Sequence, residues 1–434
     1  MGKHIVDEAK RCLQCKNPRC QKGCPINTAI PEMMKLLLEG DIHKAGEAIF
    51  ENNPLSVICS MVCPHEKQCE GNCILGAKSS PVHISTIENY ISDYSLDIMK
   101  LKPKDKLKGN IGIIGSGPAG ITIAFILALK GYNITIFEAN DKIGGVLRYG
   151  IPEFRLPKAI LDRIKDKLEK IGVVIRPNIL IGPVLTIEDL FRDGFDALFI
   201  GTGVWKPNKL NIKGESLGHV HFAIDYLKNP EVYNLGDRVC IIGAGNVAMD
   251  VARTAIRHGV RDVFIMYRKG MEDMTATEYE IEYAKIDGVK FELFKAPMEL
   301  TKEGVKYIQT KKVEEGDTVK VVEIEGSEDL FPCDSIIVAV SQGPKSNIIS
   351  TTTGIEINKH GLVVTDKYGR TTREGVFASG DVVTGARTVV EAVNYSKEVA
   401  KIIDEYVSNK YENSKNKENK LGKLDLELTE KQGG

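Results

Sequence analysis

The sequence has no excess of charge of either sign. Its 434 residues carry 58 Lys and Arg against 59 Asp and Glu, which gives a formal net charge of −1 at pH 7. Nucleic-acid-binding proteins usually show a basic excess, and disordered chains combine high net charge with few apolar residues. Here 42% of the residues are hydrophobic. The composition therefore excludes a wholly disordered chain and argues against nucleic acid as a partner.

Long apolar stretches are also scarce. The N-terminus has no apolar core, so we expect no secretory signal peptide and a cytoplasmic location; it reads MGKHIVDEAKRC. The uncharged stretch nearest to membrane-spanning length is 111–129, and Gly115, Gly117, Pro118 and Gly120 interrupt it. It predicts a strand, a turn and a buried helix, and we expect no membrane association.

Cysteine is scarce beyond residue 73, but dense before it. Of the ten cysteines, only Cys240 and Cys333 lie further along, in apolar runs that are typical of core positions. The other eight are Cys12, Cys15, Cys20, Cys24, Cys59, Cys63, Cys69 and Cys73. Their spacing is C-x2-C-x4-C-x3-C-P, then a gap, then C-x3-C-x5-C-x3-C. Because thiols of a cytosolic chain stay reduced, this crowding favours metal binding over disulfides.

The first cysteine run resembles the spacing of bacterial ferredoxins, with x4 in place of the second x2 and with a terminal Cys24-Pro25. In such a run the fourth thiolate commonly serves a second cluster. Two structural zinc sites or disulfides are the alternatives. Zinc prefers paired CxxC knuckles, and only one CxxC occurs here. The spacing therefore predicts iron–sulfur clusters, and not every cysteine need be a ligand.

Two segments repeat the dinucleotide-binding fingerprint G-x-G-x-x-G/A, each after an apolar strand and before an apolar helix. The first contains Gly115, Ser116, Gly117, Pro118, Ala119 and Gly120, and the second contains Gly243, Ala244, Gly245, Asn246, Val247 and Ala248. The first glycine allows a tight turn, the second lets backbone N–H groups approach a pyrophosphate, and the third packs helix on strand. Together the two segments predict two Rossmann-like folds.

The residues after the next strand distinguish the two nucleotides. Glu138 ends the strand that follows the first fingerprint, where a carboxylate accepts hydrogen bonds from a ribose. Arg268 and Lys269 end the corresponding strand of the second fold, where basic side chains suit the 2′-phosphate of NADP. A solvated basic pair is the alternative. Nicotinamide gives two electrons and clusters accept one, so a flavin should stand between them.

Further segments resemble the glutamate synthase small-subunit family. They are Gly144-Gly-Val-Leu-Arg-Tyr-Gly-Ile-Pro-Glu-Phe-Arg155-Leu-Pro-Lys158, Gly201-Thr-Gly-Val-Trp-Lys-Pro207, Val340-Ser-Gln-Gly-Pro344 and Ala378-Ser-Gly-Asp381-Val-Val-Thr-Gly-Ala-Arg-Thr388. The family also includes the N-terminal half of dihydropyrimidine dehydrogenase and the large subunit of a bifurcating NADH-dependent ferredoxin–NADP oxidoreductase. The resemblance covers residues 5 to about 405.

The resemblance implies two interleaved [4Fe–4S] ligand sets. Cys12, Cys15, Cys20 and Cys73 would hold one cluster, and Cys24, Cys63, Cys69 and Glu88 would hold the other. Cys59 matches a family cysteine that is not a ligand. From spacing alone, Glu88 would read as an ordinary acidic residue on a surface helix. A carboxylate is a harder ligand than a thiolate, so Glu88 should alter the potential of its cluster.

The resemblance also implies the nucleotide-binding residues. For FAD they are the 115–120 loop, Glu138, Gly145, Val146, Arg155, Gly380, Asp381 and Thr388, with Arg155 able to pair with phosphate and Asp381 able to cap the following helix. For NADPH they are Gly243, Ala244, Gly245, Asn246, Val247, Arg268 and Lys269. Some members carry a further arginine where this chain has Thr275, preceded by Glu272 and Asp273, so NADH stays open. No catalytic acid or base is required, because hydride passes directly between the cofactors.

The expected architecture is α/β: an N-terminal all-helical iron–sulfur domain (1–105) followed by two nested, three-layer Rossmann-like domains. The FAD domain would comprise 106–216 and 343–412, the NAD(P)H domain 217–342, and a flexible charged tail 413–434. The implied activity is an electron-input oxidoreductase that feeds a large partner subunit, most simply that of glutamate synthase. Alternatives are a bifurcating ferredoxin–NADP oxidoreductase subunit, the electron-input part of a dihydropyrimidine dehydrogenase, and a non-enzymatic cluster-bearing adaptor.

Overall fold

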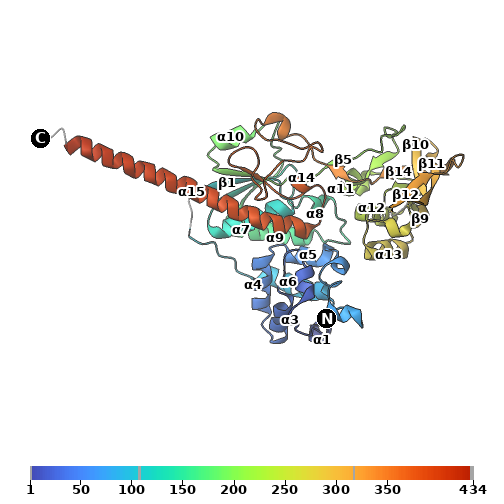
Figure 1. Ribbon diagram of the computed structural model, residues 1–434, viewed down its shortest axis with the longest axis horizontal. Helices are drawn as coiled ribbons and strands as arrows, with labels where there is room; N and C mark the ends of the chain where they lie inside the picture. The colour runs from blue at the N-terminus through green and yellow to red at the C-terminus, as the bar shows by residue number, and fades with distance from the viewer. Residues whose placement is uncertain (1, 106–108, 316–317, 431–434) are drawn as a thin grey trace. The chain divides into compact units, whose positions relative to one another are not determined.

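The computed structural model describes residues 2–105, 109–315 and 318–430. The chain forms two compact units and crosses between them four times: one unit comprises 1–144, 159–203 and 346–434, and the other comprises 145–158 and 204–345. The predicted fold class, a helical domain followed by two nested α/β domains, is confirmed (Figure 1). The exact domain limits given above stay predictions.

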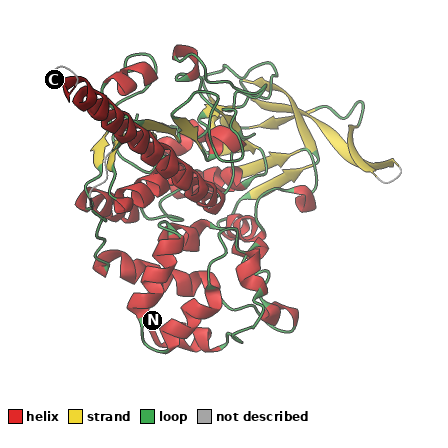
Figure 2. Cartoon of the chain, turned by 60° about the vertical axis from the view of Figure 1, so that its left-hand side comes forward, coloured by secondary structure: helices red, strands yellow, loops and turns green. Residues whose placement is uncertain are grey.

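The N-terminal part of the first unit is helical throughout the described residues 2–99 (Figure 2). Its elements are α1 (Gly2–Lys10), α2 (Arg19–Gly23), α3 (Ile30–Leu38), α4 (Ile42–Asn52), α5 (Ser56–Val62), the 3-10 turns η1 (His65–Lys67) and η2 (Ile74–Ala77), and α6 (Ile84–Ile98). Gly40 and Asp41 separate α3 from α4, and the Asp41 side chain accepts from the Lys44 N–H at the start of α4. Met33 and Met34 are buried core residues.

The rest of the first unit is a parallel sheet between layers of helices. The strand order is β16 (Val376–Ala378), β4 (Ala197–Ile200), β1 (Asn110–Ile114), β2 (Asn133–Phe137) and β3 (Val174–Arg176). The helices are α7 (Pro118–Lys130), α9 (Ala159–Lys170), α10 (Ile187–Arg192), α14 (Asp381–Thr384) and α15 (Val389–Glu430), with the 3-10 turn η5 (Ile349–Thr351). The stretch 111–129 is thus a strand, a turn and a buried helix, as predicted.

Helices α7 and α15 lie side by side although more than 250 residues separate them (Figure 1). The Tyr132 hydroxyl, just beyond α7, donates to Asp404 Oδ1 of α15 at 2.7 Å, and Lys130 pairs with the same carboxylate. Because β16 and α15 both come after the inserted unit, the sheet and its helical cover close only with the last part of the chain.

The second unit contains another parallel sheet, in the order β6 (Val220–Phe222), β14 (Ser335–Val338), β7 (Arg238–Ile242), β8 (Asp262–Tyr267) and β9 (Lys290–Leu293). One face packs on α11 (Ala223–Lys228), α12 (Asn246–Arg257) and α13 (Glu278–Ile286). The other face packs on an antiparallel sheet of β10 (Lys295–Thr301), β11 (Gly304–Glu315), β12 (Thr318–Glu323) and β13 (Asp329–Pro332). This sheet was not predicted from the sequence. Cys240 and Cys333 are buried in the core between the two sheets, as expected.

The remaining elements of the second unit are short. They are α8 (Val146–Tyr149), the β5–β15 pair (Lys206–Pro207 with Gln342–Gly343), and the 3-10 turns η3 (Pro230–Val232) and η4 (Met271–Asp273). No helix in the described part of the chain is long and apolar enough to cross a membrane. Helix α15 extends to Glu430, and 431–434 lie outside the described residues, so a flexible tail stays a prediction.

Candidate cofactor sites

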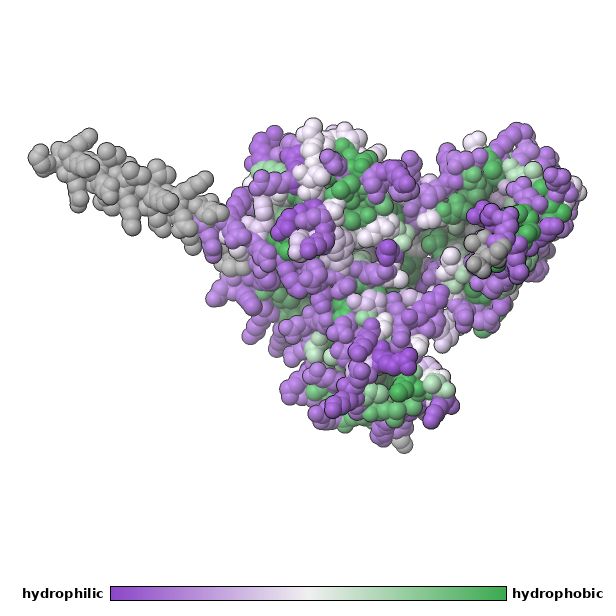
Figure 3. Space-filling model, viewed as in Figure 1, coloured by the Kyte–Doolittle hydropathy of each residue, from purple (hydrophilic) through white to green (hydrophobic). Residues whose placement is uncertain are grey.

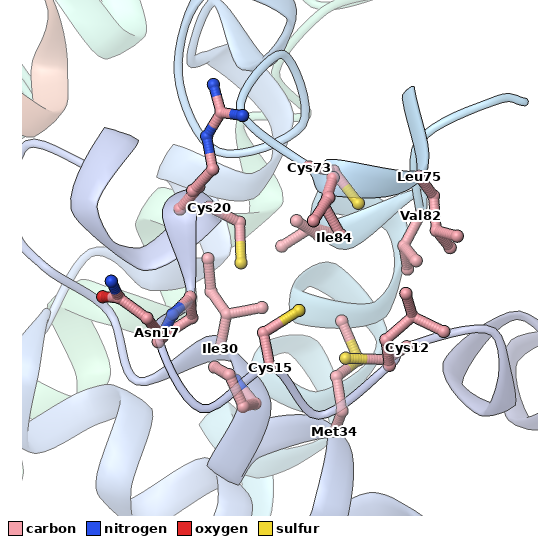
Figure 4. Close-up of a pocket in the computed structure, with 15 residues that line it drawn as sticks. Cys12, Cys15, Asn17, Cys20, Ile30, Met34, Cys73, Leu75, Val82 and Ile84 are labelled. Atoms are coloured by element: carbon pink, nitrogen blue, oxygen red, sulfur yellow. The ribbon is translucent and has the colours of Figure 1, made fainter. Parts of the chain in front are cut away.

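Four of the predicted cluster ligands line one pocket of about 260 Å³ in the helical domain. Cys12, Cys15 and Cys20 come from the loop between α1 and α2 and from α2 itself, whereas Cys73 comes from the end of the second cysteine run. Their sulfur atoms surround a common space (Figure 4). Apolar side chains complete the walls, including Ile30, Met34, Leu75, Val82 and Ile84. We call this site the cysteine pocket.

The thiols of the cysteine pocket sit in an environment that disfavours a bare thiolate. Burial raises the pKa of Cys20 to about 11, and the charges of Cys73, Cys12 and Cys15 raise it further than burial alone. Burial also raises the pKa of Cys12. Four thiolates in such a place need a positively charged metal centre to balance them. A donor set of four thiols in an apolar pocket therefore fits an iron–sulfur cluster.

The second ligand set also comes together. Burial raises the pKa of Cys69, and the charges of Glu88, Glu70 and Cys24 add to that effect, so these groups lie within electrostatic reach of one another. The pKa of Cys63 is raised by a hydrogen bond with Cys59, by burial and by the charge of Glu88.

Glu88 is a buried carboxyl and not a surface acid. It lies on α6 and is 8% exposed, and burial, with the charge of Glu70, raises its pKa to about 8. A buried carboxyl among thiols is the environment of a ligand rather than of a solvated helix face. Cys59 is buried beside Cys63, so its predicted exclusion from the ligands stays a prediction.

Among the described residues, no three His, Cys, Asp or Glu side chains converge tightly enough to hold a single metal ion. In a cubane cluster each protein ligand binds a different iron, so the four ligands stand around a larger space than a one-ion site requires.

The second ligand set lies toward the first dinucleotide fold. Lys397 of α15 donates to Asn52 Oδ1 at 2.7 Å, and Asn52 in turn donates to the Ile26 carbonyl, two residues after Cys24. The charge of Cys24 acts on Lys397. Helix α5, which ends next to Cys63, also packs on α15. These contacts place the second ligand set next to α15 of the first dinucleotide fold.

The first fingerprint forms a tight cradle between β1 and α7. Gly115 has φ +96°, and a Cβ on it would lie 2.7 Å from the Gly201 carbonyl oxygen. A Cβ on Gly120 would lie 2.0 Å from the Gly115 carbonyl oxygen. Gly117 is the N-cap of α7, and no side chain caps that helix, so its first N–H groups are available to a phosphate. The predicted strand–turn–helix is confirmed in detail.

Glu138 holds this cradle together. Its Oε2 accepts from the Ser116 N–H at 3.1 Å and from the Ser116 hydroxyl, and its Oε1 accepts from Asn140 N at 2.8 Å. The carboxylate is 4% exposed and directly follows β2, as predicted. A carboxylate has about four lone-pair sites, so it can order the loop and still accept from a ribose hydroxyl.

Gly380 brings a second segment to the same cradle, because a Cβ on it would lie 3.1 Å from the Ala119 Cβ. The expectation that Asp381 caps the next helix is wrong. Gly380 is the N-cap of the four-residue α14, Asp381 is its first residue, and Asp381 Oδ1 accepts from the Arg387 N–H at 3.2 Å. Burial raises the pKa of Asp381 to about 6. Thr388 precedes α15, and its hydroxyl donates to Glu391 at 2.6 Å.

Arg155, expected near the flavin, is held inside the second unit by two acids. Its guanidinium donates to both carboxylate oxygens of Asp250, at 2.9 and 2.7 Å, and its Nε lies 2.9 Å from Glu280 Oε1. The three side chains are 13%, 4% and 12% exposed. Asp250 lies on α12 and Glu280 on α13, so Arg155 ties segment 145–158 to these two helices. Its predicted role toward FAD stays a prediction.

Sequence reasoning missed this ion-pair network. Arg253 continues it by donating to Glu280 and to Asp287, both at 2.8 Å, and Phe154 stacks on Arg253. The sequence did hold a signal: Asp250 and Arg253 stand three residues apart, with opposite charges, among the mostly apolar residues of the helix that follows the second fingerprint. Gly145 and Val146, also predicted for FAD, lie at the start of the same segment, where Gly145 has φ +52° and precedes α8.

The second fingerprint repeats the geometry of the first, with one difference. Gly243 has φ +142°, and a Cβ on it would lie 2.3 Å from the Ala339 carbonyl oxygen. Gly245 is the N-cap of α12, and again no side chain caps the helix. Ala244 and Asn246 are tied to the 275–277 segment, because Ala244 O accepts from Ala276 N and Asn246 Oδ1 accepts from Thr277 N. The third position is Ala248, where the first fold requires glycine.

Arg268 and Lys269 directly follow β8, as predicted. Arg268 is exposed and Lys269 half-buried. The two acids that precede Thr275 share one cation: Lys312 pairs with Glu272 and lies 2.8 Å from Asp273 Oδ2, which offsets part of their charge. The Thr275 hydroxyl packs against the fingerprint, 3.4 Å from where a Cβ on Gly245 would lie.

Comparison with family models assigns both parts of the chain. Residues 1–99 match dihydropyrimidine dehydrogenase domain II, 4Fe-4S cluster, and residues 109–396 match pyridine nucleotide-disulphide oxidoreductase. FprA of Mycobacterium tuberculosis, solved in complex with NADPH, superposes with a TM-score of 0.59 at 17% identity, over 71% of this chain and 86% of that one. The protein is thus an oxidoreductase that joins an iron–sulfur domain to a pyridine nucleotide oxidoreductase domain.

Similar curated proteins identify the family more closely. The glutamate synthase [NADPH] small chain of Halomonas elongata is 34% identical over 92% of this chain and 90% of that protein. The NADP(+)-dependent formate dehydrogenase subunit beta of Moorella thermoacetica is 32% identical over 89% of this chain and 60% of that protein. The chain belongs to the glutamate synthase small-chain family.

Proposed function

We propose that this chain takes electrons from NADPH onto FAD and passes them through two [4Fe–4S] clusters to a large partner subunit in the cytoplasm. The observation that carries the proposal is the cysteine pocket, in which cysteines from two distant segments meet in the chain that also carries two dinucleotide cradles. Nicotinamide supplies a hydride, flavin accepts electrons in pairs and releases them singly, and clusters carry them one at a time.

The groups of this chain would bind and orient the cofactors. The uncapped N-terminus of α7 and the Glu138 carboxylate would hold the FAD pyrophosphate and ribose, and the N-terminus of α12 would hold the nicotinamide nucleotide. No side chain has to move a proton in hydride transfer, which agrees with the expectation of no catalytic acid or base. The two clusters would be held by the two ligand sets: Cys12, Cys15, Cys20 and Cys73 for one, and Cys24, Cys63, Cys69 and Glu88 for the other.

NADPH is the favoured donor because of the charges after β8. Lys312 offsets part of the negative charge of Glu272 and Asp273 and holds both carboxylates in ion pairs. Arg268 and Lys269 then remain as the cations that a 2′-phosphate would meet. Changing Arg268 and Lys269 to Ala should raise the KM for NADPH at least about tenfold and leave that for NADH within about twofold, since each lost charge-assisted hydrogen bond to phosphate is worth about 1.5–3 kcal/mol. Equal effects on both nucleotides would remove the pair from 2′-phosphate recognition.

The partner we propose is the large subunit of glutamate synthase, which converts glutamine and 2-oxoglutarate to glutamate. The support is the similarity to glutamate synthase small chains over about nine-tenths of both proteins. A formate dehydrogenase subunit among the relatives favours a second candidate, an input subunit for another oxidoreductase. A bifurcating ferredoxin–NADP oxidoreductase and a dihydropyrimidine dehydrogenase are further candidates, the latter because residues 1–99 match that enzyme's cluster domain.

Anaerobic reduction tests the proposal. The purified chain should contain about eight iron and eight sulfide per chain for two cubane clusters. NADPH should bleach the flavin absorbance first and then the cluster absorbance. A Cys20→Ser variant should keep flavin bleaching and lose part of the iron, whereas Cys240→Ser, a core cysteine, should keep both. Four or fewer irons after reconstitution, or no bleaching by either nicotinamide, contradicts the proposal.

A further inference from the structure

The rim of the cysteine pocket combines exposed apolar side chains with basic ones. Leu13 and Ile74 line the pocket, and they are 60% and 49% exposed although both are large aliphatic residues. Lys16, Arg19 and Lys22 lie beside Leu13 in sequence, and Lys78 follows Ile74; all four are exposed. In the space-filling view an apolar area (green) with hydrophilic neighbours (purple) lies on the helical domain (Figure 3).

The two segments that form the rim contain no carboxylate. Between Glu8 and Glu32 there is no Asp or Glu, and none between Glu70 and Glu88. Glu8 itself pairs with Arg11 at 2.6 Å, so its charge is compensated. The whole stretch 1–99 nevertheless has slightly more Asp and Glu than Lys and Arg. The basic character is therefore local to the cysteine pocket and not a property of the domain.

The two segments are neighbours in space, so their charges act on one surface. A Cβ on Gly23 would lie within 3 Å of the Asn72 side chain, which places the end of α2 directly against the residue before Cys73. Within the described residues the structure pairs Lys16, Lys22 and Lys78 with no acid. Four exposed cations thus lie on the same two neighbouring, acid-free segments as the two exposed aliphatic side chains, a combination of one charge sign with apolar surface.

This patch lies on the outward end of the proposed electron path. The second ligand set contacts α15 of the first dinucleotide fold through Asn52 and Lys397, and its Cys69 and Glu88 are buried. The four thiols of the cysteine pocket are only half-buried. An acceptor must come close to a cluster to take an electron, and the exposed side chains Leu13 and Ile74 that line the cysteine pocket show that a protein can approach this set from solvent.

We propose that the rim of the cysteine pocket, formed by Leu13, Ile74, Lys16, Arg19, Lys22 and Lys78, docks a carboxylate-rich face of an electron-accepting protein. The inference rests on the proposed function, because it names the chemistry of the partner at the end of that path. The apolar centre excludes water at the point of transfer, and the cations steer the partner and set its orientation. Electron-transfer encounters typically use small interfaces, below about 1,200 Å², which suits a rim around one pocket.

The same cations could act only inward, by stabilising the negative charge of the bound cluster. That account predicts a changed cluster potential and no change in protein binding. Lys16, Lys22 and Lys78 are exposed and do not line the pocket, whereas Arg19 does. The test therefore changes the three lysines and leaves Arg19 in place.

The test measures the binding of a purified acidic ferredoxin to the cofactor-loaded chain under anaerobic conditions, by fluorescence anisotropy of the labelled ferredoxin. The wild type should bind at least about tenfold more tightly at about 20 mM than at about 300 mM salt, since the Debye length shortens severalfold over that range. A Lys16→Glu, Lys22→Glu, Lys78→Glu variant should bind at least about tenfold more weakly at low salt. A control with Lys209→Glu, Lys302→Glu and Lys359→Glu, three exposed lysines elsewhere, should stay within about twofold.

Flavin bleaching by NADPH, iron content and cluster potentials are measured on all three proteins. Wild type without nicotinamide-dependent bleaching refutes the proposed function. If bleaching is normal, three results overturn the docking proposal and leave the proposed function intact. They are ferredoxin binding that is absent or insensitive to salt, an equal loss of binding in both triple variants, and a rim variant that changes only the cluster potential. Tighter binding of anionic phospholipid vesicles than of ferredoxin would also overturn it. A Leu13→Ser, Ile74→Ser variant, which keeps every charge, should weaken binding at both salt concentrations, and it serves as the second variant if the charge reversal misfolds.

Discussion

The third position of each fingerprint offers a matched pair of substitutions. In the first fold, a Cβ on Gly120 would lie 2.0 Å from the Gly115 carbonyl oxygen, although carbon and oxygen in contact stay about 3.2 Å apart. Helix α7 would therefore have to move more than about 1 Å from the loop. Gly120→Ala should cost about 1–3 kcal/mol of unfolding free energy, the usual range for overpacking. The displaced loop and helix N-terminus would no longer present their N–H groups to the pyrophosphate, so FAD should be lost on purification.

Ala248→Gly is the control, because the second fold already holds a methyl group at this position. It should cost about 1–2 kcal/mol, from glycine inside a helix and a lost buried methyl. The flavin should stay bound, since the first cradle is untouched. The assay is the flavin-to-protein ratio after gel filtration, together with a thermal melt. Full flavin content in Gly120→Ala at an unchanged Tm would refute the packing argument, and flavin loss in Ala248→Gly would show that the two cradles are not independent.

Two further predictions concern the buried charges. Arg155→Ala leaves Asp250 and Glu280 without their shared cation and should cost about 3–5 kcal/mol of unfolding free energy, measured by denaturant melts. Arg155→Lys should fall in between, because it keeps the charge but has only one nitrogen in place of the two, Nη1 and Nε, that contact the two acids. Full flavin content in the alanine variant would assign Arg155 to the second unit, whereas flavin loss at unchanged stability would assign it to FAD. Burial raises the pKa of Asp381 to about 6, above the unfolded value near 4, so its protonation stabilises the native state and that contribution is lost as pH rises. Between about pH 5 and 7 the unfolding free energy of the wild type should fall by about 1 kcal/mol relative to that of Asp381→Asn. Parallel pH profiles of the two unfolding free energies would contradict this.

Local rules predicted the cradles well, because each depends on a few consecutive residues. Gly115 and Gly243 adopt positive φ and Glu138 follows its strand, since glycine freedom and strand-end placement are properties of short segments. The grouping of the cysteines and Glu88 could not be derived from spacing, because it depends on how η2 and α6 fold back on the first run. It came instead from the family resemblance, and the structure brings the same groups together.

Contacts between residues that lie far apart in the sequence could not be predicted, because no local pattern encodes them. The antiparallel sheet of β10–β13 covers one face of the second parallel sheet, where helices were expected, and its strands alternate like any half-buried strand. The pairing of Arg155 with Asp250 and Glu280 joins residues about 100 apart, and no local pattern selects those acids over others. The cap expected at Asp381 failed because Gly380 already begins α14, at a φ of +75°.

The insertion of one unit within another sets an order of events during synthesis. Residues 204–345 leave the ribosome as an almost complete parallel sheet with its covering helices and lack only segment 145–158, which has already been made. Strand β4, in contrast, waits as an open edge for β16, and the apolar helix α7 waits uncovered for α15. The nicotinamide fold can therefore finish first, and the FAD cradle closes only when Gly380 arrives. An uncovered helix and an unpaired strand edge are sites of aggregation, so the interval before β16 and α15 are synthesised should be the most hazardous stage of the protein's biogenesis.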